Sequence, residues 1–374
     1  MENLKTKNVL ISGASFAGLS TAYWMNKLGY KVTVIDISNG LKKGGTPVNV
    51  MGQTIDTIKD MGLFDQILKN RITMESMEFK NADNITERTV DIQDDHRKKN
   101  EEEYEVERDF LLHLVFDSVK DNTEFIFGES ILSIRDQGER VSVNFRSGFE
   151  RPFDLVFGCD GVHSAVRKLC FGPEEEFSHF LHTYFSITIV EKLLIPEYTN
   201  QMYNEPGKMV MLNAYNNKTD IVMCFSSDEQ IAYDYRDEDQ QRAIVRERFT
   251  GTGWRTPELL EELINSKTWY FDKLCQMKMP SWTKGRIALI GDAAYCASPA
   301  AGRGGSLAID GAAALAAAFQ KYSDNYELAF QYYNESFRPF IEEVQAGVID
   351  FGLEMLIPRT EVAIRKRNLG ELDF

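Results

Sequence analysis

The sequence lacks the residue patterns that define several common protein classes. Its 374 residues include five cysteines, and no two of them stand in C-x-x-C spacing. A disulfide framework or a structural zinc site is therefore not expected, and reduced thiols fit better. The five histidines show no H-E-x-x-H or similar spacing. His179 and His182 stand three residues apart, but ordinary polar residues explain them better than a metal pair does. We expect no bound metal.

Long apolar runs and an excess of positive charge are also missing. No run of about 18 apolar residues occurs, so no transmembrane helix is expected. Residues 1–8 are polar and lack the apolar core of a signal peptide, which favours a cytoplasmic location. The chain has 42 Lys and Arg against 57 Asp and Glu, a formal net charge of −15. Nucleic acids and anionic membranes both bind basic faces, so neither is expected as a partner.

Apolar residues are nevertheless plentiful. The chain is 43% hydrophobic and contains 24 Phe and 15 Tyr, which is enough for a packed interior. At roughly 150 residues per domain, the length predicts two domains.

The first motif lies at the start of the chain. Residues 9–12 predict a buried strand, which runs into a turn containing Gly13, Ser15 and Gly18, a helix and a second strand that ends in Asp36. This order is typical of a dinucleotide site. Gly13 permits the tight turn, Gly18 allows close packing of the helix, the helix N–H groups face a pyrophosphate, and Asp36 accepts from ribose hydroxyls. Ser15 replaces the middle glycine but is small enough for close approach. An ordinary strand–helix turn is the alternative.

Two further motifs follow in order. Residues 154–161 predict a strand that ends in Asp160-Gly161 and leads to a helix carrying Arg167. Residues 285–294 predict another strand, which ends in Gly291-Asp292. A proline- and glycine-rich loop at 298–306 then feeds an alanine-rich helix.

These three motifs together resemble the single-component FAD-dependent aromatic hydroxylases, the group that includes 4-hydroxybenzoate hydroxylase, over about residues 9–340. Residues 42–52 and 277–286 resemble the tetracycline-inactivating flavin monooxygenases, or tetracycline destructases, more closely. The resemblance implies an α/β fold with a Rossmann-like FAD-binding domain, a β-sheet substrate domain and a C-terminal bracing helix. It assigns 1–72, 104–174 and 278–325 to the FAD-binding domain, 73–103 and 175–277 to the substrate domain, and 326–374 to C-terminal helices.

The resemblance also implies roles for individual residues. The cofactor-binding set comprises Gly13, Ser15, Gly18, Asp36, Lys42, Gly45, Asn49, Arg108, Asp160, Asp292, Pro299, Gly302, Arg303, Gly304, Gly305 and Ser306. In this set Asp292 would bind the ribityl chain, and Pro299 with the Gly302–Ser306 backbone would lie along the isoalloxazine. The alternatives are a surface arginine for Arg108, a helix cap for Asp292 and a structural tie between loops for Asp160.

The sequence gives weaker signals for the residues that contact NAD(P)H and the aromatic substrate. Asp160 and Arg167 belong to the motif that contacts NAD(P)H in the family. Candidate residues lining the substrate pocket are His179, Tyr184, Phe185, Met211 and Phe225, and ordinary core packing is the alternative for each.

Three positions depart from the destructase pattern. Asn49 stands where those enzymes usually have Asp, Arg303 where they have Gln, and Ser306 where they have Asn. The hydroxybenzoate hydroxylases carry a basic residue at the place of Arg303. A cation there is therefore compatible with catalysis and would favour an anionic reduced flavin.

The implied activity is that of an FAD- and NADPH-dependent monooxygenase, acting as a monomer. In the family, NAD(P)H reduces FAD, O₂ adds to flavin C4a, and the hydroperoxide delivers one oxygen atom to a bulky aromatic or polycyclic substrate, of which tetracycline is one candidate. The cofactor carries the chemistry, so no catalytic side chain is expected. Another phenolic or polyketide metabolite is the alternative substrate. The same motifs would also suit a reductase-like or halogenase-like flavoprotein or a non-enzymatic flavin sensor, although the Trp-x-Trp-x-Ile-Pro segment of halogenases is missing.

Overall fold

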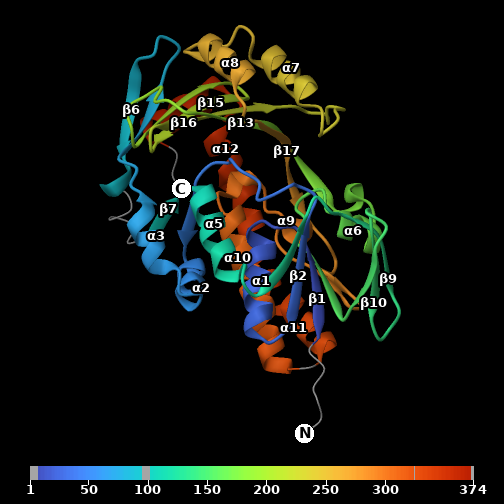
Figure 1. The fold of residues 1–374 in the computed structure, drawn as a ribbon. Coiled ribbons are helices and arrows are strands. Elements are labelled where there is room, and N and C mark those ends of the chain that lie inside the picture. Colours follow the sequence, from blue (N-terminus) through green and yellow to red (C-terminus); the bar gives the residue numbers. More distant parts are fainter. Residues whose placement is uncertain (1–6, 95–101, 324, 372–374) are drawn as a thin grey trace.

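The computed structural model describes residues 7–94, 102–323 and 325–371 and contains two large sheets (Figure 1). The first sheet has six strands in the order β18-β19-β12-β1-β2-β8. Its inner strands pair in parallel, and only β18 runs antiparallel to its neighbour. Strand bounds are β1 (Asn8–Ser12), β2 (Lys31–Asp36), β8 (Thr123–Phe127), β12 (Leu155–Gly158), β18 (Thr283–Lys284) and β19 (Ile287–Leu289).

Helices cover this first sheet, which explains why its strands are continuous apolar runs rather than alternating ones. α1 packs against both α10 and α5, and α10 packs against α11. The four helices are α1 (Phe16–Lys27), α5 (Arg108–Val119), α10 (Gly304–Tyr322) and α11 (Tyr326–Gly347). The sheet and helices share the largest core of the described residues, in which strand side chains such as Val9, Leu10 and Ile11 are fully buried.

The second large sheet has seven strands in the order β17-β13-β16-β15-β14-β5-β6. All neighbours pair antiparallel except β14 and β5. Figure 1 shows α7 (Glu238–Phe249) and α8 (Thr256–Asn265) on its outer face, with the first sheet on its other side. The strands are β5 (Ser76–Lys80), β6 (Thr86–Asp91), β13 (Ser178–Val190), β14 (Thr199–Glu205), β15 (Lys208–Tyr215), β16 (Lys218–Ser226) and β17 (Tyr270–Met277).

Smaller elements complete the fold. Two three-stranded sheets have the orders β11-β10-β9 and β3-β7-β4. Their strands are β3 (Val48–Met51), β4 (Arg71–Ile72), β7 (Glu103–Val106), β9 (Ile131–Asp136), β10 (Val141–Phe145) and β11 (Glu150–Phe153). The short helices are α2 (Gln53–Asp60), α3 (Phe64–Asn70), α6 (Ala165–Cys170) and α9 (Asp292–Tyr295), with 3₁₀ turns η1 (Glu174–Glu176) and η2 (Pro299–Ala301).

The C-terminal segment runs back to the second sheet. After α11 come a π-helical turn, η3 (Val348–Gly352), then α12 (Leu353–Leu356) and α13 (Glu361–Leu369). Val348 and Ile357 join the apolar cluster on the inner face of the second sheet. The buried Arg367 fixes this arrangement, because its guanidinium donates to Asn204 Oδ1 at 2.8 Å and to the Met355 carbonyl at 2.7 Å. The expected mixed α/β fold, with a nucleotide-type sheet and a separate β-sheet, is confirmed. None of the helices in the described ranges combines the length and hydropathy needed to cross a membrane.

Candidate flavin site

The turn after β1 and the first turn of α1 leave no room for side chains at Gly13 and Gly18. Gly13 has φ +109°, and an added Cβ would lie 2.3 Å from the Cys159 carbonyl oxygen. At Gly18 an added Cβ would lie 1.8 Å from the Gly13 carbonyl oxygen. Ser15 precedes α1 in extended conformation, and its side chain makes no capping bond within the described part of the chain. The helix N-terminus is therefore available to an anionic group, as a dinucleotide site requires.

Asp36 lies beside this turn at the end of β2. Its Oδ2 accepts from the Ala14 N–H at 2.8 Å, and its Oδ1 accepts from the Ser38 N–H at 2.8 Å. These two bonds fix the orientation of the carboxylate against the turn. Each carboxylate oxygen has a second lone pair, so Asp36 can still accept from ribose hydroxyls.

Arg108 shapes the loop between β2 and β3. Its Nη1 donates to the carbonyls of Lys42 at 3.0 Å and Gly44 at 2.9 Å, and its guanidinium lies 5.6 Å from the centre of the Phe16 ring. Burial lowers the pKa of Arg108, and the adjacent Asp109 opposes this shift. At Gly45 an added Cβ would lie 2.6 Å from Arg108 Cδ, so the glycine permits the close contact. Arg108 thus lies between the N-terminus of α1 and the Lys42–Gly45 loop.

The start of α10 is pressed against β3. The Ser306 hydroxyl donates to the Asn49 carbonyl, and a Cβ at Gly305 would lie 2.7 Å from Val48 Cγ1. Arg303, Ser306 and Asp310 line a cavity of about 260 Å³ together with Met51, Gly52, Gln53, Thr54, Leu307 and Phe340. Burial raises the pKa of Asp310 to about 6, although Thr54, Gln53, Thr57 and the charge of Arg303 favour its ionised form. The charge of Arg303 is therefore partly balanced from within the protein.

Asp292 begins α9 directly after Gly291. Burial raises the pKa of its carboxyl to about 6, and a hydrogen bond from Cys296 opposes this shift. The loop that follows holds Pro299 at the start of η2 and Gly302 in left-handed conformation, with φ +64°. Ala300 and Ala301 in this loop pack against the inner-face cluster of the second sheet. The loop therefore contacts both the core of the first sheet and the inner face of the second sheet.

Asp160 and Arg167 make their bonds within the chain itself. The Asp160 carboxylate accepts from the Ser164 hydroxyl and from the N–H groups of Ala165 and Val166, which ties down the start of α6. The buried Arg167 donates to the carbonyls of Ala293, at 3.0 Å, and Val162. This geometry favours the structural alternative for Asp160, and it gives Arg167 the same kind of role, linking the second motif to the third.

These features match those of known proteins. A family model described as "FAD binding domain" matches residues 6–344, which is most of the chain. The chain belongs to this family of FAD-binding proteins. A flavin-dependent monooxygenase of Legionella longbeachae is 32% identical, over 91% of this chain and 87% of that protein. An uncharacterised protein of Mycobacterium tuberculosis is 35% identical, over 92% of this chain and 93% of its own.

A solved structure supports the same conclusion. The tetracycline destructase Tet(51) is 29% identical and has a TM-score of 0.86, covering 98% of this chain and 95% of its own. The chain is therefore an FAD-binding monooxygenase similar to tetracycline destructases. The residues around the start of α1 fit FAD. Two glycines stand where only hydrogen fits, and Asp36 contacts Ala14, Arg108 lies beside Phe16, and Gly291, which precedes Asp292, lies beside Ala17.

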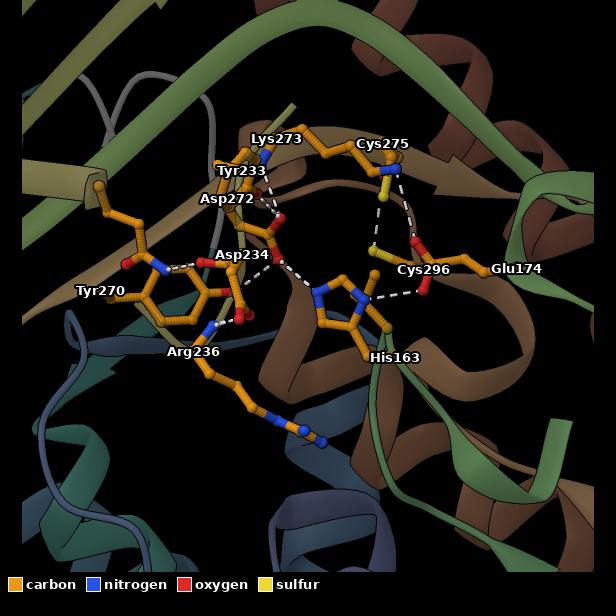
Figure 2. A network of polar contacts seen from close by, with 12 residues as sticks. His163, Glu174, Tyr233, Asp234, Arg236, Tyr270, Asp272, Lys273, Cys275 and Cys296 are labelled. Carbon is orange, nitrogen blue, oxygen red and sulfur yellow. Dashed lines mark hydrogen bonds and ion pairs between the residues drawn. The ribbon is translucent and has the colours of Figure 1, made fainter. Parts of the chain in front are cut away.

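The flavoprotein also contains an ion network that its sequence did not reveal (Figure 2). His163 Nδ1 lies 2.7 Å from Glu174 Oε2, and its Nε2 lies 3.3 Å from Asp272 Oδ2. Burial lowers the pKa of His163, but the hydrogen bonds and charges of Asp272 and Glu174 outweigh it and raise the pKa to about 10. The ring also stacks on Tyr235, with 4.8 Å between ring centres. The imidazolium thus links the loop before α6 to strand β17 of the second sheet. The only sequence signal was the position of His163 directly after the Asp160-Gly161 motif.

The candidate residues of the substrate pocket lie on different faces of the second sheet. Phe185 and Met211 belong to the inner-face cluster that contacts Ala300 and Ala301 of the proline- and glycine-rich loop at 298–306, called the flavin loop below. Tyr184 and Phe225 instead lie in the outer core beneath α7 and α8. His179 is exposed near the start of β13. Only Phe185 and Met211 therefore face the flavin side.

The same inner face also carries a row of polar side chains that the sequence did not predict. Asn213 pairs directly with Asn200 on one side and with Asp220 on the other, so the three side chains share a face with Met211 two residues along. Tyr215 donates to Asp220 Oδ1 at 3.0 Å, while Oδ2 has no hydrogen-bond partner among the residues described. Burial raises the pKa of Asp220 to about 8. No local pattern marks this row, because its members come from three strands.

Proposed function

We propose that this chain is an FAD- and NADPH-dependent monooxygenase that inserts one oxygen atom of O₂ into a bulky aromatic or polycyclic substrate, with tetracycline as the first candidate. The similarity to Tet(51) over nearly the whole chain supports this substrate class. The observation that carries the proposal is that Ala300 and Ala301 of the flavin loop pack against the same apolar cluster that contains Phe185 and borders Met211. That contact would place an apolar substrate wall beside the cofactor.

In this proposal FAD supplies the redox chemistry, accepting reducing equivalents from NADPH and activating O₂. The chain's own residues bind and orient it. Gly13, Ser15, Gly18 and Asp36 would hold the ADP half, and Asp292 would bind the ribityl chain. Around the ring would lie Lys42, Gly45, Asn49, Arg108, Pro299, Gly302, Arg303, Gly304, Gly305 and Ser306. N–H groups at the start of α10 would stabilise negative charge on the reduced ring.

The proposed domains are those implied by the resemblance to the FAD-dependent aromatic hydroxylases. Residues 1–72, 104–174 and 278–325 would form the FAD-binding domain, and 73–103 with 175–277 the substrate domain. Residues 326–374 would brace both domains as a C-terminal segment. The contacts of Val348 and Ile357 with the inner face of the second sheet support this bracing role. The proposed active unit is a monomer.

The test is an oxygenation assay. FAD-loaded protein would be mixed with NADPH and O₂, with and without tetracycline, while absorbance at 340 nm and product mass are followed together. Faster NADPH oxidation with a product heavier by one oxygen atom is the expected result. Faster oxidation with an unchanged tetracycline mass would mean that tetracycline only fits the site and that the substrate is another aromatic compound. No stimulation at all would exclude tetracycline as a substrate.

A second candidate substrate class is another phenolic or polyketide metabolite. Arg303 and Ser306 support it, because they replace the Gln and Asn of the destructases beside the flavin loop. Ser306 uses its hydroxyl on the Asn49 carbonyl. A panel of phenols and polyketides in the same assay separates the two candidates. Oxygenation of a panel member but not of tetracycline would favour the second.

A further inference from the structure

Two buried cysteines lie side by side where the segment that follows Gly291-Asp292 contacts the second sheet. Cys275 is on β17, and Cys296 directly follows α9, which begins with Asp292. Figure 2 shows the two sulfur atoms facing each other in hydrogen-bond contact. The Cys296 thiol also lies 3.6 Å from the Cys275 carbonyl oxygen. Cys275 is 1% exposed and Cys296 3%.

The backbone around the pair is held in place by hydrogen bonds. The Met277 N–H donates to the Cys296 carbonyl at 2.9 Å. Gln345, a buried residue of α11, donates to the carbonyls of Met277 at 3.0 Å and Cys296 at 3.1 Å. The His163 network fixes the same strand from the other side, through Asp272. Both segments are therefore held next to each other in the folded protein, as a disulfide between them requires.

The two thiols differ in reactivity. The hydrogen bond from Cys296 lowers the pKa of Cys275, and nearby Lys273 acts in the same direction. The hydrogen bond to Cys275, burial and the charge of Asp292 raise the pKa of Cys296 well above its ordinary value. Cys275 is therefore the better nucleophile, and Cys296 is the protonated partner that can resolve it.

We propose that Cys275 and Cys296 form a peroxide-sensitive modification site, in which hydrogen peroxide converts the thiol pair to a disulfide between β17 and the flavin-binding segment. The Cys275 thiolate attacks one oxygen of H₂O₂, the O–O bond breaks, and the released hydroxide takes up a proton to leave as water. The resulting sulfenic acid is attacked by Cys296, which forms the S–S bond and releases a second water. Overall, two thiols and one H₂O₂ give one disulfide and two waters.

The position of the pair beside the proposed cofactor site indicates what the disulfide changes and where the peroxide comes from. Cys296 directly follows α9, the short helix that begins with Asp292, so a cross-link to β17 shifts the segment that carries a residue proposed to hold the cofactor. Oxidised protein is therefore expected to bind FAD more weakly than reduced protein. The oxidant would be made at the site when NADPH and O₂ are consumed without substrate, giving NADP⁺ and H₂O₂. This second step rests on the proposed function, whereas the thiol chemistry does not.

The experiment adds H₂O₂ in small excess to the full chain, with and without FAD, and then alkylates the protein under denaturing conditions. We expect two of the five thiols to be lost, an intact mass lower by two hydrogens, a Cys275–Cys296 cross-linked peptide, and reversal by dithiothreitol. C275S and C296S should each abolish the cross-link. C224S, at an equally buried cysteine of the same sheet, should retain it. The unmutated protein carries the main readout, so misfolding of a variant does not prevent a result.

Two outcomes would overturn the site: both thiols surviving while Cys170, the least buried of the cysteines, is oxidised, or oxidation of a single cysteine that never advances to the cross-link. A second arm replaces H₂O₂ with NADPH and O₂, with and without catalase, which should prevent the cross-link. If added peroxide forms the disulfide but NADPH is never consumed, the proposed function fails and the thiol site stands. If NADPH is consumed and neither arm gives the cross-link, the thiol site fails and the function stands.

Discussion

The two large sheets of this flavoprotein differ in how directly their chemistry follows from local sequence. In the first sheet the site lies at turns that directly follow strands β1, β12 and β19, and each turn is a short motif. In the second sheet the inner face is assembled from strands that pair across distant segments, so its apolar patch and its polar row have no local signature. A site built at strand ends can be recognised from spacing, whereas a site built on a sheet face depends on pairing.

Substitution of Gly18, which lies in α1 beside the first sheet, should give the largest effect. The helix can approach the preceding turn only because this residue has no Cβ. G18A would place a Cβ 1.8 Å from the Gly13 carbonyl oxygen. We expect a loss of several kcal/mol in unfolding free energy, in the range of about 2–5 kcal/mol for a buried clash or forced shift, together with loss of bound FAD. Urea unfolding and the flavin content of purified protein measure the two effects.

G347A is the matched control, since Gly347 is also helical and its Cβ would meet nothing within 4 Å. It should keep full FAD content and gain up to about 1 kcal/mol from helix propensity. Equal FAD content in G18A and G347A would show that the close approach at the first turn does not matter.

On the second sheet, Asp220 should make stability depend on pH. Burial raises its pKa from 3.8 to about 8, so the folded state favours the protonated form. The contribution of Asp220 to the stability of the folded protein should therefore fall as pH rises from about 4 to about 8. D220N removes this contribution, so its stability relative to the unmutated chain should rise across that window, by at most about 1.4 kcal/mol per pH unit.

Urea unfolding at several pH values between 5 and 8 measures this difference. The charged and titratable groups around Asp220 are Tyr215, Glu105, Glu107 and Lys218, and they are the same in both proteins. D83N, at an exposed aspartate, is the control and should track the unmutated chain. A constant difference between D220N and the unmutated chain at every pH would contradict a buried neutral carboxyl.

His163 links the two sheets, so its loss tests how far they depend on each other. Its pKa is raised from 6.5 to about 10 by two carboxylates, and its ion pairs stabilise the folded state fully below pH 6.5. H163Q should destabilise the protein by about 1 kcal/mol near pH 6, and the difference should shrink as pH rises toward 10. Thermal unfolding of both proteins across this range provides the measurement. A difference that grows with pH would mean that the histidine is neutral in the folded state.

The smallest effects should come from neighbouring residues that face opposite sides of the second sheet. F185L changes the inner face beside the flavin loop and should raise KM for an accepted substrate severalfold, with stability lowered by about 1 kcal/mol. Y184F changes the outer core, where the Tyr184 hydroxyl accepts from the Ile231 N–H at 2.7 Å. It should lower stability by about 1 kcal/mol and leave KM unchanged. Steady-state kinetics and urea unfolding separate the two roles, and a KM change in Y184F would contradict the assignment of faces.

Local sequence was enough to predict the order of strands, turns and helices around the first sheet, since Gly13, Gly18 and Asp36 lie in one short βαβ unit with a recognisable spacing. The Gly291-Asp292 turn and the flavin loop could be predicted in the same way. Only the folded chain shows that Tyr184 and Phe185 face opposite cores, because alternation along a strand does not say which face is inside. The contacts of His163 with Asp272 and of Cys275 with Cys296 likewise form only when the second sheet packs against the first, so no spacing in the chain encodes them.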